Sequence, residues 1–165
     1  MQISQKITPC LWFASEAEEA ARYYVGIFPD SKIGKIARYG KAGFETHQQP
    51  EGTVLTVQFE LAGQPFTALN GGPVFKFNEA VSLQIYVEDQ EELDHYWNGL
   101  TAGGDPKSHV CGWLKDRYGL SWQVVPRKMV EWFGDPSEKS ERVMSSLLEM
   151  GKLDIAALER AYEGR

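Results

Sequence analysis

A helical segment that occurs twice constrains the fold of this chain more than any other feature. EEAARYYVGI, which starts at Glu18, aligns without a gap with EELDHYWNGL, which starts at Glu91, at an offset of 91 − 18 = 73 residues. The segment GQPFT from Gly63 matches GLSWQ from Gly119 at an offset of 119 − 63 = 56 residues. A helix and a hairpin that recur in the same order indicate a duplicated unit. We therefore predict two β-α-β-β-β units in an α+β fold, the second shorter by 73 − 56 = 17 residues.

Hydrophobic periodicity and turn residues place the expected elements. In the first unit a helix is predicted over 15–28, with Ser15 as the N-cap residue and Glu18 three positions on. Strands are predicted at 3–13, 32–38, 53–61 and 65–70, with a loop at 40–52. The second unit is predicted to contain a strand at 80–87, a helix at 88–100 and strands at 109–115 and 120–125. These elements define one domain over 1–126, with repeats at 1–72 and 78–126, and a helical extension at 127–165 that packs on this domain or on a partner subunit.

Charge and hydropathy exclude several classes of partner. The formal net charge is −6, which argues against nucleic acid or an anionic membrane surface as the main partner. The first residues, MQISQKITPCLWF, lack the apolar core of a signal peptide, and no run of about 18 apolar residues is present to span a bilayer. Cys10 and Cys111 are the only cysteines, too few for a disulfide framework. We expect a cytoplasmic protein with reduced thiols and no membrane or nucleic-acid partner.

Four stretches carry a resemblance to a known family: ITPCLWFASEAEEAARYYVGIFPDS, ALNGGPVFKFNEAVSL, CGWLKDRYGLSWQVVP and KLDIAALERAY. They resemble the PhnB-like branch of the vicinal oxygen chelate superfamily, which includes glyoxalase I and bleomycin-resistance proteins. The resemblance covers most of the chain. It implies two sheets curled into a cup, with helices outside and a ligand inside, and it implies a homodimer.

Members of this branch are often labelled 3-demethylubiquinone-9 3-methyltransferase. An S-adenosylmethionine-dependent enzyme is expected to show a strand that runs into a Gly-rich loop and a helix. The segment YGKAGFETHQQPEG at 39–52 has neither the glycine spacing nor the following helix. The sequence therefore gives the methyltransferase label no support, and we predict no cofactor.

Strand alternation divides polar from apolar side chains in a way that suits the cup. In SLQIYV at 82–87, one face carries leucine, isoleucine and valine, while the other carries serine, glutamine and tyrosine. In LSWQVV at 120–125, Gln123 falls on the face opposite Trp122, where a polar group can meet water or ligand. The predicted ligand-binding residues are Trp12, Thr67, Ser82, Gln84, Tyr86, Trp113 and Gln123.

The metal site of metal-dependent relatives is not expected in this chain. In those relatives His and Glu side chains from equivalent strands hold a divalent metal. The resemblance places these positions at Thr8 or Pro9, at Thr67 or Ala68, and at Ser82 and Gln123. None is His, Asp or Glu, and neutral amides and hydroxyls alone bind such cations too weakly. We also expect surface or structural roles for His47, His95 and His109.

The sequence leaves three functions open. The first is a metal-free protein that binds a small organic ligand in the cup. The second is a lyase, isomerase or dioxygenase with a non-standard metal or acid/base site, for which Glu60 and Cys10 are weak catalytic candidates. The third is a structural protein whose cup is vestigial. Asn70, in ALNGGP, is expected to be a turn residue near the mouth of the cup.

Overall fold

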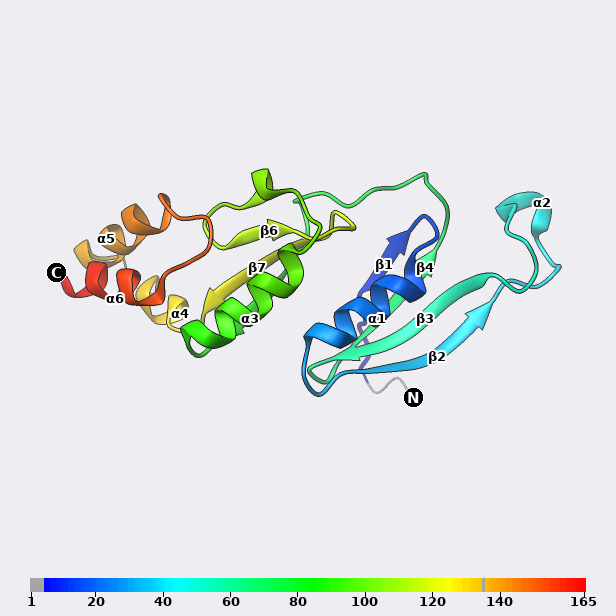
Figure 1. Cartoon of the computed structure of the whole chain (residues 1–165), viewed down its shortest axis with the longest axis horizontal. Helices are drawn as coiled ribbons and strands as arrows, with labels where there is room; N and C mark the ends of the chain where they lie inside the picture. Colours follow the sequence, from blue (N-terminus) through cyan, green and yellow to red (C-terminus); the bar gives the residue numbers. More distant parts are fainter. Residues whose placement is uncertain (1–4, 135) are drawn as a thin grey trace. The chain divides into compact units, whose positions relative to one another are not determined.

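The computed structural model describes residues 5–134 and 136–165, which form two compact units, one ending at Lys76 and the other spanning Phe77–Arg165. Each unit contains one mixed sheet with a helix on one face (Figure 1). Neither sheet closes into a barrel, and the predicted α+β class is confirmed. No helix in the described part of the chain has both the length and the apolar character needed to cross a bilayer.

The first unit contains a four-stranded sheet. Its elements are β1 (Cys10–Phe13), α1 (Ala17–Ile27), β2 (Lys32–Arg38), α2 (Phe44–His47), β3 (Val54–Leu61) and β4 (Gln64–Asn70). The strand order is β1-β4-β3-β2, with β1 parallel to β4 and the other pairs antiparallel. Helix α1 packs on β3 and β4, where the buried ring of Tyr24 stacks on Phe59 at a centroid distance of 6.3 Å. The single turn α2 interrupts the segment that was predicted to be only a loop.

The N-cap of helix α1 lies one residue later than predicted, because the capping group comes from β4. The N-cap residue is Glu16, not Ser15, and its side chain makes no capping hydrogen bond. Asn70 supplies that bond from 53 positions away, since its Oδ1 accepts from the backbone N–H of Ala17 at 2.8 Å. The Asn70 amide also donates to the Val54 carbonyl at 3.1 Å. This side chain therefore ties the helix to the sheet.

The second unit follows the same path with one strand fewer. Its elements are β5 (Ser82–Val87), α3 (Gln90–Thr101), the 3₁₀ turn η1 (Pro106–Ser108), β6 (Trp113–Lys115) and β7 (Ser121–Pro126), in the sheet order β5-β7-β6. Residues 102–112, all described, form no named strand equivalent to β2. Instead, Val110 bridges to Trp113 and the Ser108 hydroxyl accepts from the Lys115 backbone N–H at 2.8 Å. A short segment thus covers the edge of β6 that a fourth strand would occupy.

The turn between β6 and β7 is organised by a buried carboxylate. Asp116 is only 3% exposed. Its Oδ1 accepts from the backbone N–H groups of Tyr118 and Leu120, at 2.8 and 3.1 Å, and its Oδ2 accepts from the indole N–H of Trp122 at 2.9 Å. These bonds fix the hairpin and the orientation of the Trp122 ring on the apolar side of β7.

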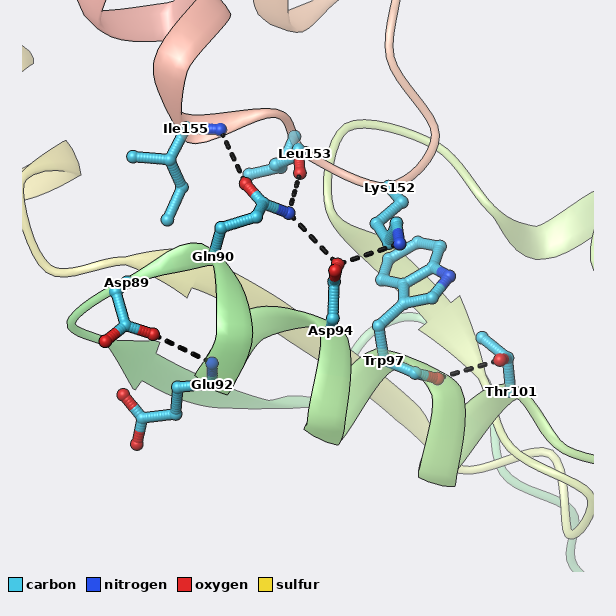
Figure 2. A network of polar contacts seen from close by, with 9 residues as sticks. All are labelled: Asp89, Gln90, Glu92, Asp94, Trp97, Thr101, Lys152, Leu153 and Ile155. Carbon is cyan, nitrogen blue, oxygen red and sulfur yellow. Dashed lines mark hydrogen bonds and ion pairs between the residues drawn. The ribbon is translucent and has the colours of Figure 1, made fainter.

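The C-terminal extension belongs to the second unit and contains α4 (Met129–Trp132), α5 (Glu138–Leu147) and α6 (Ile155–Glu163), with α5 and α6 packed against each other. Gln90, at the start of α3, holds the segment between α5 and α6 (Figure 2). Its amide donates to the Leu153 carbonyl at 3.1 Å and to Asp94 at 3.0 Å, and accepts from the Ile155 backbone N–H at 2.9 Å. Lys152 pairs with Asp94 at 2.8 Å. These polar contacts therefore tie the extension to α3.

Candidate functional site

Four of the predicted ligand-binding side chains form one hydrogen-bonded chain across β5 and β7. Gln84 lies opposite Gln123 in this parallel pair, so their side chains share a face of the sheet. The Gln123 amide donates to Ser82 Oγ at 2.8 Å, and Gln123 Oε1 accepts from Gln84 Nε2 at 3.3 Å. The Tyr86 hydroxyl donates to Gln84 Oε1 at 3.2 Å. We call Ser82, Gln123, Gln84 and Tyr86 the polar ladder.

The polar ladder is accessible, whereas the opposite face of the same strands is buried. Gln84 and Tyr86 are exposed, and Tyr86 is 39% exposed, while Ile85 and Val87 are buried in the core. This agrees with the alternation in the sequence. Each ladder amide uses one N–H and its carbonyl oxygen within the ladder, which leaves a second N–H for another acceptor. The ladder is thus a neutral, hydrogen-bonding surface.

Trp113 adds an aromatic wall beside the polar ladder. It lies opposite Gln123 in the antiparallel pair of β6 and β7 and is half-buried. A cleft of about 480 Å³ adjoins it. Its lining includes Glu79, Lys107, Cys111, Trp113, Lys115 and Ser121. This volume lies within the range of roughly 300–1,000 Å³ that small-molecule pockets occupy.

Charged side chains lie at both ends of the sheet face. Beside the start of β5, Lys115 forms an ion pair with Glu79, and the hydrogen bond from Lys115 lowers the pKa of the Glu79 carboxyl. Beyond the end of β7, Arg127 pairs with Glu88 at 2.6 Å, and its guanidinium carbon lies 6.0 Å from the ring centroid of Tyr86. These residues are not among those predicted from the sequence. Lys115 could have been found, because it is two positions from Trp113 on one strand, but nothing local marks Glu79.

The two predicted residues of the first unit are outside the ladder. The Trp12 indole N–H donates to the Gly72 carbonyl at 2.9 Å, and its ring lies edge-on to Phe75 at a centroid distance of 5.0 Å. A Cβ atom at Gly71 would lie 2.2 Å from the Trp12 ring, so this ring is packed directly on the loop after β4. Thr67 is half-buried opposite Cys10. Trp12 thus has a role in its own unit, and a ligand contact by either residue stays a prediction.

The geometry around Glu60 and Cys10 gives little support to catalysis. Glu60 forms an ion pair with Lys32 at 2.9 Å, at a register position where β2 and β3 pair. Cys10 lies at an exposed position of β1, and desolvation of its sulfur raises the pKa of the thiol. A raised pKa lowers the thiolate fraction at neutral pH, which is the reverse of what a nucleophile needs.

The side chains at the family's ligand positions do not fit a metal. Ser82, Gln123 and Thr67 offer only hydroxyl and amide oxygens, which are neutral donors. Among residues 5–134 and 136–165, no group of three or more His, Cys, Asp or Glu side chains could hold a metal ion. We therefore derive no step through a metal.

The histidines lie in three separate environments. His47 forms a hydrogen bond with the Ala42 carbonyl at 3.1 Å, and His95 is exposed on α3. His109 packs edge-on against Trp97 at a centroid distance of 5.1 Å, with its Nε2 buried and without a hydrogen-bond partner in the described structure. His47 and His95 thus lie at positions of the expected kind, whereas the buried Nε2 of His109 lacks, among the described residues, the hydrogen-bond partner expected of a satisfied structural histidine.

Two β-α-β units, each with a parallel pair formed by its first and last strands and an outer helix on one face, define a glyoxalase-like protein of the vicinal oxygen chelate superfamily. The family model of 3-demethylubiquinone-9 3-methyltransferase matches residues 5–125. The chain therefore belongs to this family, and the predicted resemblance is confirmed. The matched residues end before the C-terminal extension.

Several solved structures are similar to this chain, two of them from Bacillus cereus and Pseudomonas aeruginosa. One is described as a putative 3-demethylubiquinone-9 3-methyltransferase, PhnB protein, from Bacillus cereus; it is 37% identical over 74% of this chain and 99% of its own, with a TM-score of 0.62. The other is protein PA1353 from Pseudomonas aeruginosa, 19% identical over 74% of this chain and 98% of its own, with a TM-score of 0.55. The second likeness concerns the fold alone. No curated protein matches the chain.

Proposed function

We propose that this protein binds a small organic molecule, without a metal ion, on the sheet face formed by the polar ladder and Trp113. The observation that carries the proposal is the ladder itself: two amides and two hydroxyls joined by three hydrogen bonds across an accessible sheet face. Polar groups fixed in place beside an aromatic wall are typical of ligand pockets.

The polar ladder contributes little to the stability of the fold. Hydrogen bonds between exposed side chains replace equally good bonds to water, so their net contribution to folding is small. A ligand that displaces this water, however, meets donors and acceptors whose positions are already fixed by their neighbours, which reduces the entropy lost on binding. The arrangement therefore favours recognition over structural support.

Methyl transfer, which the family's name describes, is not the function we propose. In residues 39–52, all of which are described, the only helix is the single turn α2, and it follows Gly43 without a preceding parallel strand. This is unlike the strand, Gly-rich loop and helix that hold dinucleotide-like cofactors. The acid/base alternative is not favoured either, given the ion pair of Glu60 and the raised thiol pKa of Cys10.

A screen of small molecules followed by nuclear magnetic resonance on isotope-labelled protein tests the proposal. We expect the ligands that bind to shift the side-chain amide signals of Gln84 and Gln123 and the indole signal of Trp113. Gln123→Leu should weaken binding by about tenfold, since it removes a fixed polar partner from the site.

The matched control is Gln64→Leu, because Gln64 and Gln5 form another exposed amide pair, at 3.1 Å, in the first unit. This variant should bind like the unmodified protein. Ligands that perturb only residues outside β5, β6 and β7, or that bind equally well to Gln123→Leu, would contradict the proposal. The homodimer and the cytoplasmic location stay predictions, the first of which light scattering tests directly.

A further inference from the structure

The cleft beside β6 has an uneven charge. Lys107 and Lys115 contribute two positive charges and Glu79 one negative charge, which leaves an excess of one positive charge among these three lining residues. Lys115 is paired with Glu79, whereas Lys107 is exposed and forms no ion pair with any residue that the structure describes. This contrasts with the net charge of −6 on the whole chain. The cleft is thus a local cationic site on an acidic protein.

The carboxylate of Glu79 lies where an anionic ligand would be expected. The segment that carries it is held on the sheet, because the Ser121 hydroxyl donates to the Asn78 carbonyl at 3.4 Å. Asn78 in turn accepts from the Ala80 backbone N–H at 2.9 Å, which forms a local turn around Glu79. Glu79 is exposed, so water competes with Lys115 for its carboxylate and the ion pair adds little to stability. An incoming oxyanion can therefore replace this carboxylate beside Lys115 at a small cost in free energy.

The aromatic wall and one of the two cationic groups of the cleft come from one strand, while Lys107 comes from η1. Trp113 and Lys115 are two positions apart on β6, so they share a face, and Ser121 lies opposite Lys115 in the register with β7. A ligand with a flat apolar body on the Trp113 ring would therefore place a substituent near the Lys115 ammonium group. Ammonium groups recognise carboxylates and phosphates as point charges.

We propose that the cleft takes the oxyanionic group, a carboxylate or a phosphoryl group, of a planar ligand whose body lies on Trp113. Lys115 and Lys107 pair with the oxyanion, and Glu79 is the internal group that it displaces from Lys115. The inference rests on the proposed function and deepens it, because it assigns the charge of the ligand and the end of the sheet at which that charge lies.

Titrations with benzoate, phenyl phosphate and the uncharged benzamide, followed by nuclear magnetic resonance, test this proposal. We expect the anions to bind about tenfold or more tightly than benzamide, and their affinity to fall as salt is added. Lys115→Met should remove the preference for the anions, while Glu79→Gln should strengthen anion binding several-fold because a competing charge is gone. The two anions distinguish a carboxylate site from a phosphoryl site.

Lys128→Met is the matched control, because Lys128 also forms an ion pair, with Glu159, on the same unit. It should leave anion binding unchanged. Equal affinity for benzamide, benzoate and phenyl phosphate would overturn this inference and leave the proposed function standing. Anion binding that is lost in Arg127→Gln but not in Lys115→Met would overturn it as well, because the charge would then lie at the Tyr86 end. Absence of binding by all three probes, together with a ligand screen without hits, would overturn both proposals.

Discussion

The two sheets of this protein have corresponding parallel strand pairs, but their polar side chains make different contacts. Cys10 lies opposite Thr67 in the first unit as Gln84 lies opposite Gln123 in the second, in both cases across a parallel strand pair. In the first unit, nearby polar groups bind the unit's own loops and strands, as the bond from Trp12 to the loop after β4 illustrates. In the second unit, the side chains of the polar ladder bind one another and remain accessible. The duplicated framework is thus maintained by internal polar contacts in one copy and carries an open polar surface in the other.

If the first unit uses its polar groups for folding, Asn70→Ala should cause the largest loss of stability. The substitution leaves the backbone N–H of Ala17 and the carbonyl of Val54 without their partner. We expect the free energy of unfolding to fall by about 2–4 kcal/mol, because a buried helix cap and a second, partly buried hydrogen bond are lost together. Urea denaturation measures this change. A loss below about 0.5 kcal/mol would mean that water replaces both bonds, and Asn70 would then become a candidate for ligand contact.

Gly71→Ala tests whether the Trp12 ring is fixed by packing on its own loop. The added methyl group would lie 2.2 Å from the ring, so the ring or the loop must move. Overpacking of this kind costs about 1–3 kcal/mol. The control is Gly40→Ala, because a Cβ atom there meets nothing within 4 Å. If thermal denaturation gives the same midpoint for both variants, Trp12 is free to move and could still line a ligand site.

Gln123→Leu should change stability little, by less than about 1 kcal/mol, because the polar ladder is accessible and water replaces its bonds. Gln90→Leu is the informative comparison within the same unit. The Gln90 amide bonds to Asp94, Leu153 and Ile155, and its loss should cost about 1–3 kcal/mol (Figure 2). The same urea experiment separates the two glutamines. A Gln123→Leu variant as unstable as Gln90→Leu would show that the ladder supports the fold.

How well the sequence predicts a feature of this protein depends on how far apart along the chain the interacting residues lie. The repeat of the helix and the hairpin predicts both sheets, because periodicity and turn residues are local signals. Alternation along β5 and β7 places Ser82, Gln84 and Gln123 on one face for the same reason, and the ladder follows once the two strands pair in register.

Contacts between distant segments were not predicted. The cap of α1 comes from Asn70, 53 positions beyond the N–H group that it binds, so local capping rules selected Ser15 instead. Glu79 reaches Lys115 from a segment with no regular structure. The fourth strand of the second unit is also absent, since Ser108 and Val110 cover the edge of β6. Each of these depends on which segments meet in space, which a single sequence does not encode by period or spacing.

The smallest expected effect concerns the reactivity of Cys10, at the position of the first sheet that corresponds to Gln84 in the second. In a Cys111→Ser variant, which leaves one thiol, we expect iodoacetamide to modify the native protein more slowly at neutral pH than the urea-unfolded chain. Desolvation raises the pKa of the Cys10 thiol, so fewer thiolates are present at a given pH. The rate should therefore reach half its maximum at a higher pH in the native state.

Since the neutral thiol is the form that the fold favours, its contribution to stability is complete below the unfolded pKa and is lost as the pH rises through the folded pKa. A native thiol that reacts faster than the unfolded one would reverse the comparison between the two sheets, because the first sheet would then carry an activated group on its open face.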